Sequence, residues 1–200
     1  MNYMLEEIIN TSKEGELQKY LTDNKKILVA AFGEPGWFYN IVIPKFRFGS
    51  DFESDFIVLT GQSYNYWIKL VELEPSLTSP FTKEGIYSKR LNQAIKQVDE
   101  WKDWIVRHET YFKESLLKAI KIHNPSFDET FDFARKFYVS PHIVIGRRGS
   151  LTPDDNRRRA NELEKSHLDI MTYDRLIDIE RKIINLENKG IPFDRYRFEI

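Results

Sequence analysis

The stretch KFRFGSDFESDFIVLTGQSYNYWIKLVELEP, residues 45–75, decides the fold. Its first half alternates aromatic with charged residues, which is the period of a half-buried strand. The aromatic residues are Phe46, Phe48, Phe52 and Phe56, and the charged ones are Lys45, Arg47, Asp51, Glu53 and Asp55. Turns are expected at residues 49–51 and 61–65, and Pro75 stops the last strand, residues 66–74. The stretch therefore predicts three consecutive strands in an antiparallel meander.

The sequence on either side of the meander predicts mostly helices. Thr11 and Ser12 are good N-caps for a helix that precedes it. The segments that follow it are expected to form an amphipathic helix from residue 87 to about 105, a short strand at 142–145, and helices at 154–167 and 173–188. The predicted fold class is α/β (α+β), a central mixed sheet with the antiparallel meander, flanked by helices. Residues 1–200 are expected to form a single domain with its core at about 12–176.

The composition limits the function classes. The chain has 200 residues, no cysteine, 41% hydrophobic residues and a formal charge of -1. A disulfide scaffold and a thiolate metal site are excluded, and no whole-molecule field attracts nucleic acid or an anionic membrane. Residues 1–10 lack the basic start of a signal peptide, and the longest apolar run is far too short to span a membrane. We therefore expect a cytoplasmic protein with no membrane partner.

Three carboxylates at the strand ends are the candidate for chemistry. If Gly61 pairs with Tyr66, Asp55 lies opposite Glu72, and Glu74 lies on the same face, two residues farther along its strand. Three such acids repel one another unless a cation lies among them, and Mg²⁺ prefers carboxylate oxygens. A shift of one residue in the pairing would instead put Asp55 on the opposite face. The alternative is that these acids form the solvated face of an edge hairpin.

Several ordered motifs resemble the Shedu antiphage-defence nuclease domain, over about residues 16–176. They are Phe48-Gly49 through Asp55-Phe56, Val71-Glu72-Leu73-Glu74-Pro75, Gln93-Ala94-Ile95-Lys96-Gln97 with Trp101, Ile145-Gly146-Arg147-Arg148 and Thr172-Tyr173-Asp174. The resemblance implies membership of the PD-(D/E)XK nuclease superfamily, with its restriction-endonuclease-like core of helix, three strands, helix and strand. That order agrees with the order of elements predicted above.

The resemblance also implies an activity and its residues. The chain would be a metal-dependent DNA endonuclease of an antiphage defence system, hydrolysing phosphodiester bonds with Mg²⁺ or Mn²⁺. Asp55 and Glu72 would bind the metal, and Gln97 on the following helix would reach the active site. Glu16 resembles an accessory acid found on the first helix of some members. Many defence nucleases with this core act as oligomers, so a homo-oligomer is an open alternative to a monomer.

One residue departs from the superfamily pattern. Glu74 stands where a lysine usually stabilises phosphate charge. It could serve as a further metal ligand or as a general base toward water. Lys69 has the wrong strand parity to replace that lysine, whereas Lys83 could approach from the next loop. The competing hypothesis is a catalytically impaired nuclease-fold module that binds nucleic acid or a protein partner as a sensor, and a third is a pure protein-interaction domain.

Two adjacent arginines are a weaker candidate for binding nucleic acid. Arg147 and Arg148 follow the predicted strand at 142–145 and could hold phosphate groups, because arginine clusters position phosphate backbones. An arginine-rich segment is equally well explained as a solvated helix surface. Both interpretations stay open on the sequence alone.

Overall fold

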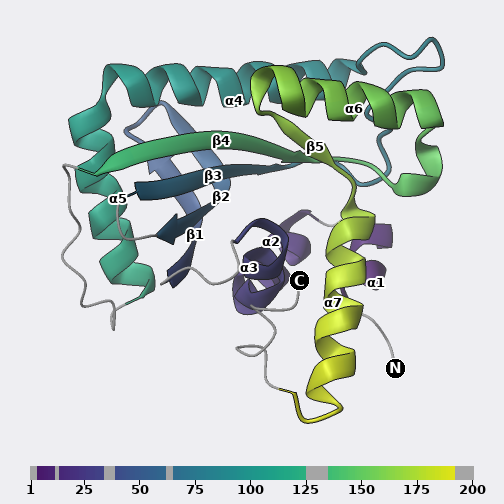
Figure 1. Ribbon diagram of the computed structural model, residues 1–200, viewed down its shortest axis with the longest axis horizontal. Helices are drawn as coiled ribbons and strands as arrows, with labels where there is room; N and C mark the ends of the chain where they lie inside the picture. Colours follow the sequence, from purple (N-terminus) through teal and green to yellow (C-terminus); the bar gives the residue numbers. More distant parts are fainter. Residues whose placement is uncertain (1–3, 12–13, 34–38, 62–64, 125–134, 192–200) are drawn as a thin grey trace.

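A five-stranded mixed sheet forms the centre of the molecule in the computed structural model, which describes residues 4–11, 14–33, 39–61, 65–124 and 135–191. The strands lie in the order β1-β2-β3-β4-β5 (Figure 1). The first three pair antiparallel, while β4 is parallel to β3 and β5 is parallel to β4. The strands are β1 Tyr39–Phe48, β2 Phe52–Gly61, β3 Asn65–Leu73, β4 Lys136–Val144 and β5 Asp169–Met171.

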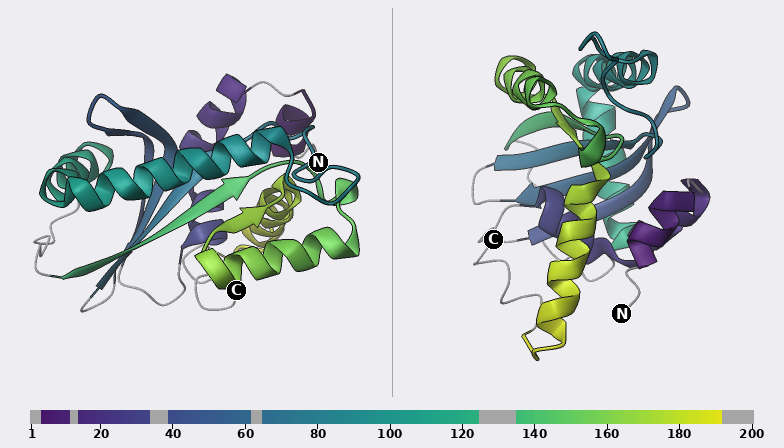
Figure 2. Two further views of the ribbon diagram at one scale, coloured as in Figure 1. Left: turned by 90° about the horizontal axis from the view of Figure 1, so that it is seen from above. Right: turned by 90° about the vertical axis from the view of Figure 1, so that its right-hand side faces the viewer.

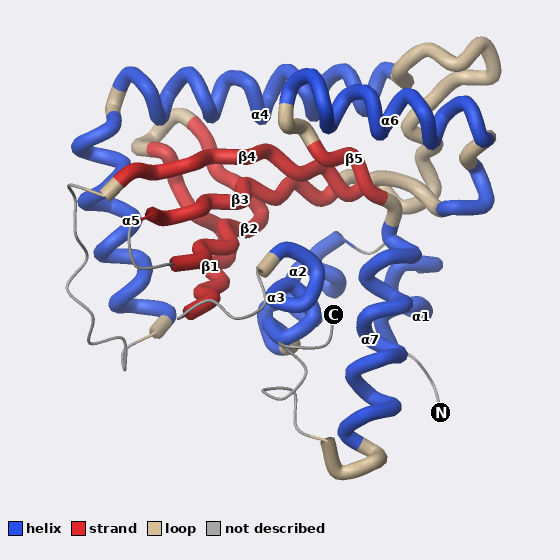
Figure 3. Tube along the Cα trace, in the orientation of Figure 1, coloured by secondary structure: helices blue, strands red, loops and turns tan. Residues whose placement is uncertain are grey.

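Helices cover both faces of this sheet (Figures 1 and 2). The helices are α1 Met4–Thr11, α2 Glu14–Asp23, α3 Lys25–Phe32, α4 Lys89–Arg107, α5 Glu109–His123, α6 Pro153–Ser166 and α7 Tyr173–Glu187. On one face, α4 and α5 bury Trp101 and Phe112 against β1 to β4, and on the other, α1 to α3 and α7 bury Leu28 and Ile177 against Val58. Figure 3 shows the strands between these two helical layers. None of the helices in the described ranges is long and apolar enough to cross a membrane.

The pairing of the meander follows the loop length that the sequence predicts. Gly61 pairs with Tyr66, and the antiparallel ladder continues without a slip to Phe56 and Val71. Asp55 and Glu72 are the next residues beyond that last pair, so the predicted register is confirmed. The mixed α/β class, the meander and the helix at 154–167 are also present, with α6 ending one residue earlier.

Strand β1 changes its alternation at Lys45. This residue has a φ of +48°, in the left-handed region that residues other than glycine seldom adopt. Before it Ile43 faces the core under α4 and α5, and after it Phe46 faces the same core, although the two are an odd number of residues apart. The kink therefore separates Lys45 from the regular ladder, whose pairs resume on either side.

Two strand segments were not predicted. β4 begins at Lys136, six residues before the expected start, and the three-residue β5 lies where no strand was expected. Pro141 obscured β4, because proline is rare in central strands. It is tolerated because β5 begins only opposite His142, so the part of β4 that contains Pro141 pairs with β3 alone. The apolar segment at residues 27–32, left unassigned from the sequence, lies in α3.

Candidate active site

Asp55 lies where the ladder between β2 and β3 ends, and its side chain is 9% exposed. Its Oδ2 accepts a hydrogen bond from the backbone N–H of Leu73 at 2.8 Å. The carboxylate thus takes an acceptor position that a backbone carbonyl would otherwise fill. The backbone carbonyl of Asp55 accepts from Nε2 of Gln18 on α2 at 3.1 Å. The first bond orients the carboxyl group toward β3, and the second links the backbone of Asp55 to α2.

Glu72 points toward α4 and is 9% exposed. Nε2 of Gln97, on α4, donates to its Oε1 at 2.9 Å. Burial, followed by the negative charges of Asp55 and Glu74, raises the pKa of Glu72 from 4.5 to about 9. The hydrogen bond from Gln97 and the charge of Lys45 act in the opposite direction but do not outweigh these effects. Glu72 is therefore protonated near neutral pH unless a further cation lies beside it.

Lys45 supplies an ammonium group to the acids from β1. Its Nζ lies 2.6 Å from Oδ1 of Asp55 and 3.9 Å from Oε1 of Glu53, and its side chain is 45% exposed. Burial alone would lower the pKa of Lys45, but the hydrogen bond and charge of Asp55, with the charges of Glu53 and Glu72, raise it. Lys45 is therefore a permanent positive charge at the site. Sequence reasoning considered Lys69 and Lys83 for this role and missed Lys45.

A signal for Lys45 was present in the sequence. The predicted turn at residues 49–51 makes Phe48 and Phe52 partners, and the structure contains this pair. Counting outward from it places Lys45 opposite Asp55. A lysine directly across a hairpin from a buried acid is within reach of that acid.

Glu74 is held by a different cation. It is 2% exposed, and Nε of Arg90, in the first turn of α4, pairs with its Oε2. The backbone of Glu74 is fixed as well, because its N–H donates to the carbonyl of Val144 at 2.8 Å and its carbonyl accepts from the Tyr173 hydroxyl at 2.8 Å. Arg90 is placed by the start of α4, where Oγ of Ser88 accepts from the N–H of Leu91. Arg90 too was missed from the sequence.

Three of the other predicted residues, Glu16, Lys83 and Arg147, lie outside β2 and β3, the strands that position the acids of the site. Glu16 is exposed on α2, and the residue of that helix that bonds to Asp55 is Gln18. Lys83 is exposed in the loop between β3 and α4. Arg147 joins α1 to α7, with Nη1 at 2.7 Å from Oδ1 of Asn10 and Nε at 3.3 Å from Oδ1 of Asp174.

Arg148 also bonds to α7, since its Nη2 donates to Oδ2 of Asp178 at 2.6 Å. The aspartates on α7 thus engage both arginines that were predicted to bind phosphate. Arg148 in addition lines a pocket whose lining contains none of the three acids of the site.

The carboxylate oxygens of Asp55 and Glu72 are the type of ligand that a hard cation such as Mg²⁺ prefers. Within the described ranges no group of three or more histidine and acidic side chains is arranged to hold a metal ion. Asp55 and Glu72 interact electrostatically, however, and Glu72 is buried without enough positive charge to ionise at neutral pH. Mg²⁺ commonly uses only one or two carboxylates, with water and phosphate oxygens as its other ligands. Asp55 and Glu72 therefore fit such an ion, and Glu74, paired with Arg90, is not required as a ligand.

The comparison with protein families gives one match. A family model described as "Shedu protein SduA, C-terminal" matches residues 11–177. No curated protein matches the chain. The matched range contains every residue of the site described above.

Proposed function

Because the chain belongs to the family of the Shedu protein SduA C-terminal domain, we propose that it is a metal-dependent DNA endonuclease of an antiphage defence system, with a PD-(D/E)XK type of core. The observation that carries this proposal is the cluster of Asp55, Glu72 and Lys45 at the end of the meander. A lysine beside two buried carboxylates provides the charges needed for hydrolysis of a phosphodiester.

Asp55 and Glu72 would hold Mg²⁺ or Mn²⁺ through their carboxylate oxygens. A bound Mg²⁺ lowers the pKa of a water ligand and offsets negative charge on phosphate. Gln97 orients the Glu72 carboxyl through its amide, and Leu73 orients the Asp55 carboxyl through its N–H. The residues around the two acids thus fix the direction of their oxygens before any ligand binds.

Lys45 would stabilise charge on the phosphate. Its side chain is 45% exposed while its ammonium group contacts Asp55, so a substrate phosphate could approach the lysine from solvent. Because its pKa is raised, it acts as a fixed positive charge rather than as a base. In this proposal, Lys45 on β1 performs the task that the superfamily usually gives to the position of Glu74 on β3.

Cleavage of DNA by matched variants tests the proposal. Purified protein is incubated with linear, nicked and supercoiled DNA in the presence of Mg²⁺ or Mn²⁺, and the wild type is compared with Asp55→Asn, Glu72→Gln and the control Glu100→Gln. Glu100 lies on α4 and pairs with Lys96, outside the site. We expect the two site variants to lose activity by about 100-fold or more, and the control to keep it. Equal cleavage by the wild type and Glu72→Gln would refute the assignment.

The alternative is a nuclease-like module without catalysis that binds DNA or a protein. It is favoured by the two ion pairs Lys45–Asp55 and Arg90–Glu74, which already neutralise two of the three acids. Calorimetric titration with Mn²⁺ separates the two functions. Binding that is lost in Asp55→Asn supports the enzyme, whereas no binding of Mn²⁺, with or without DNA, supports the module.

A further inference from the structure

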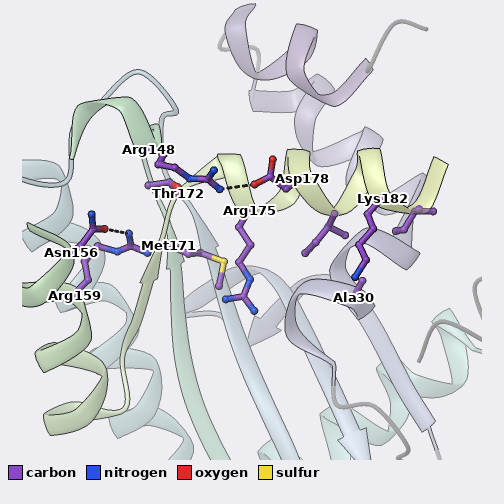
Figure 4. Close-up of a pocket in the computed structure, with 11 residues that line it drawn as sticks. Ala30, Arg148, Asn156, Arg159, Met171, Thr172, Arg175, Asp178 and Lys182 are labelled. Carbon is purple, nitrogen blue, oxygen red and sulfur yellow. Dashed lines mark hydrogen bonds and ion pairs between the residues drawn. The ribbon is translucent and has the colours of Figure 1, made fainter. Parts of the chain in front are cut away.

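A pocket of about 470 Å³ lies beside α7, away from the acids described above (Figure 4). Its walls come from α3, α6, β5, α7 and the 3₁₀ turn at Arg148–Ser150. The volume is within the range of sites that hold small molecules. Of the residues considered above for phosphate binding, Arg148 lines this pocket.

The lining of the pocket is strongly basic. It contains Arg148, Arg159, Arg175 and Lys182, against one acid, Asp178. Figure 4 shows these side chains around the pocket, from α6, α7 and the turn before α6, with Arg148 pointing toward Asp178 and Arg159 toward Asn156. If the nearby Asp169 is counted as well, the four positive charges face two negative ones. The pocket therefore has an excess of positive charge in a protein whose formal charge is -1.

The hydrogen bonds of two arginines leave much of this charge uncompensated. Arg159 donates through Nε to the carbonyl of Ile170 and through Nη1 to Oδ1 of Asn156 at 3.1 Å. Arg175 donates through Nη2 to the carbonyl of Ala31 at 3.2 Å. These acceptors are neutral, so they orient the guanidinium groups, and the carboxylate that acts on both arginines is that of Asp169. Two fixed guanidinium groups of this kind are suited to a phosphate.

The arginines are close enough to disfavour one another. Burial lowers the pKa of Arg159, and the charges of Arg175 and Arg148 lower it further, although Asp169 acts in the opposite direction. Like charges held together in this way are relieved by an anion between them. This electrostatic effect supports the inference drawn from the pocket geometry.

Apart from the polar Asn156 and Thr172, the rest of the lining is apolar. This apolar surface comes from Ala30, Met171, Ile179 and Ile183. Binding of a bare anion would bury none of it against an apolar group, so it would add no hydrophobic stabilisation. A ligand that uses the whole pocket must combine an anionic group with a flat or apolar one. We propose that this pocket binds a mononucleotide, with its phosphate on Arg148, Arg159 and Arg175 and its base against the apolar wall. The proposal does not depend on nuclease activity.

Isothermal titration calorimetry in EDTA tests this inference on the full chain. The probes are adenosine monophosphate, adenosine, inorganic phosphate and a 5′-phosphorylated oligonucleotide. We expect the monophosphate to bind more tightly than either adenosine or phosphate. Arg175→Gln and Lys182→Gln should weaken its binding by about tenfold or more, because each removes a positive charge from the lining of the pocket. The matched control is Arg157→Gln, an exposed arginine of α6 that pairs with Asp154 and does not line the pocket.

Specific outcomes would overturn the proposal. They are no binding of the monophosphate, binding as tight for adenosine or for phosphate alone, or binding that neither pocket variant weakens. An oligonucleotide that binds the pocket far more tightly than the monophosphate would assign it to a nucleic-acid strand instead. Arg175 and Lys182 are both exposed, so each variant tests the proposal even if the other fails to fold. Glu72→Gln should bind the monophosphate as the wild type does, which separates this result from that of the cleavage assay.

Discussion

Replacement of Glu72 by glutamine should stabilise the metal-free protein, by an amount that grows with pH. Glutamine has the same shape as a protonated glutamate and keeps an oxygen that can accept from Gln97. Unlike glutamate, it cannot ionise in the unfolded chain. The variant therefore removes the proton linkage of Glu72 while preserving its packing.

The magnitude follows from the pKa of Glu72. The folded-state value, about 9, lies above the ordinary value of 4.5. The stability that this group contributes is fully present below the unfolded value and is lost as the pH rises toward the folded value. Each pH unit in this interval lowers the free energy of unfolding by about 1.4 kcal/mol relative to the variant. Between pH 4.5 and neutrality the difference should reach about 3 kcal/mol.

Urea unfolding in EDTA, followed by the fluorescence of the four tryptophans, measures this difference. The wild type and Glu72→Gln are compared from about pH 5 to about pH 8, the range in which the linkage of Glu72 operates. Glu100→Gln, a half-exposed acid on α4, serves as the control and should show no such slope. Parallel stability curves for the wild type and Glu72→Gln would refute the claim that Glu72 is buried without sufficient positive charge. Addition of Mn²⁺ should stabilise the wild type more than the variant.

Three further substitutions test other parts of the structure. Lys45→Met should reduce DNA cleavage by about 100-fold while the exposed control Lys96→Met keeps it; equal loss in both would mean that Lys45 has no special role. Arg90→Met leaves the carboxylate of Glu74 buried without its ion pair and should cost about 2 kcal/mol in urea unfolding, and an unchanged midpoint would contradict that pairing. Gly146→Ala should cost about 2 kcal/mol or more, because its φ is +68° and a Cβ would lie 2.6 Å from the Thr78 carbonyl oxygen; a variant with the Tm of the wild type would disprove this packing.

The meander and its register were predictable because local rules determine them. The loop between Gly61 and Tyr66 fixed which residues pair, and the alternation at residues 45–56 marked the strands. The helix α4 followed from its apolar period. The three-residue β5 is too short to show a strand alternation in the sequence. It forms by pairing with the edge of β4.

The acids of the site were predictable from the register, and of their two cations only Lys45 left a signal in the sequence, through the turn at residues 49–51. Without the turn, the alternation alone does not distinguish Lys45 from Arg47, and nothing in it indicated the left-handed φ at Lys45. Arg90 reaches Glu74 only because the loop after β3 brings the start of α4 back over the end of the strand. Gln97 was selected by the family resemblance, since an amide on an amphipathic helix is otherwise a common boundary residue. Contacts that depend on how a long loop folds cannot be predicted from the spacing of residues in the sequence.

The pairing of Lys45 with Asp55 across a short hairpin has a consequence for motif searches. The two residues are ten positions apart, a separation fixed by the turn between them. A motif search that accepts the catalytic lysine only beside Glu72 on β3 would classify this chain as a catalytically inactive nuclease. Related chains with glutamate at the position of Glu74 should be inspected for a basic residue ten positions before their aspartate. If the lysine has moved from the position of Glu74 to that of Lys45, the residues at these two positions should vary together within the family.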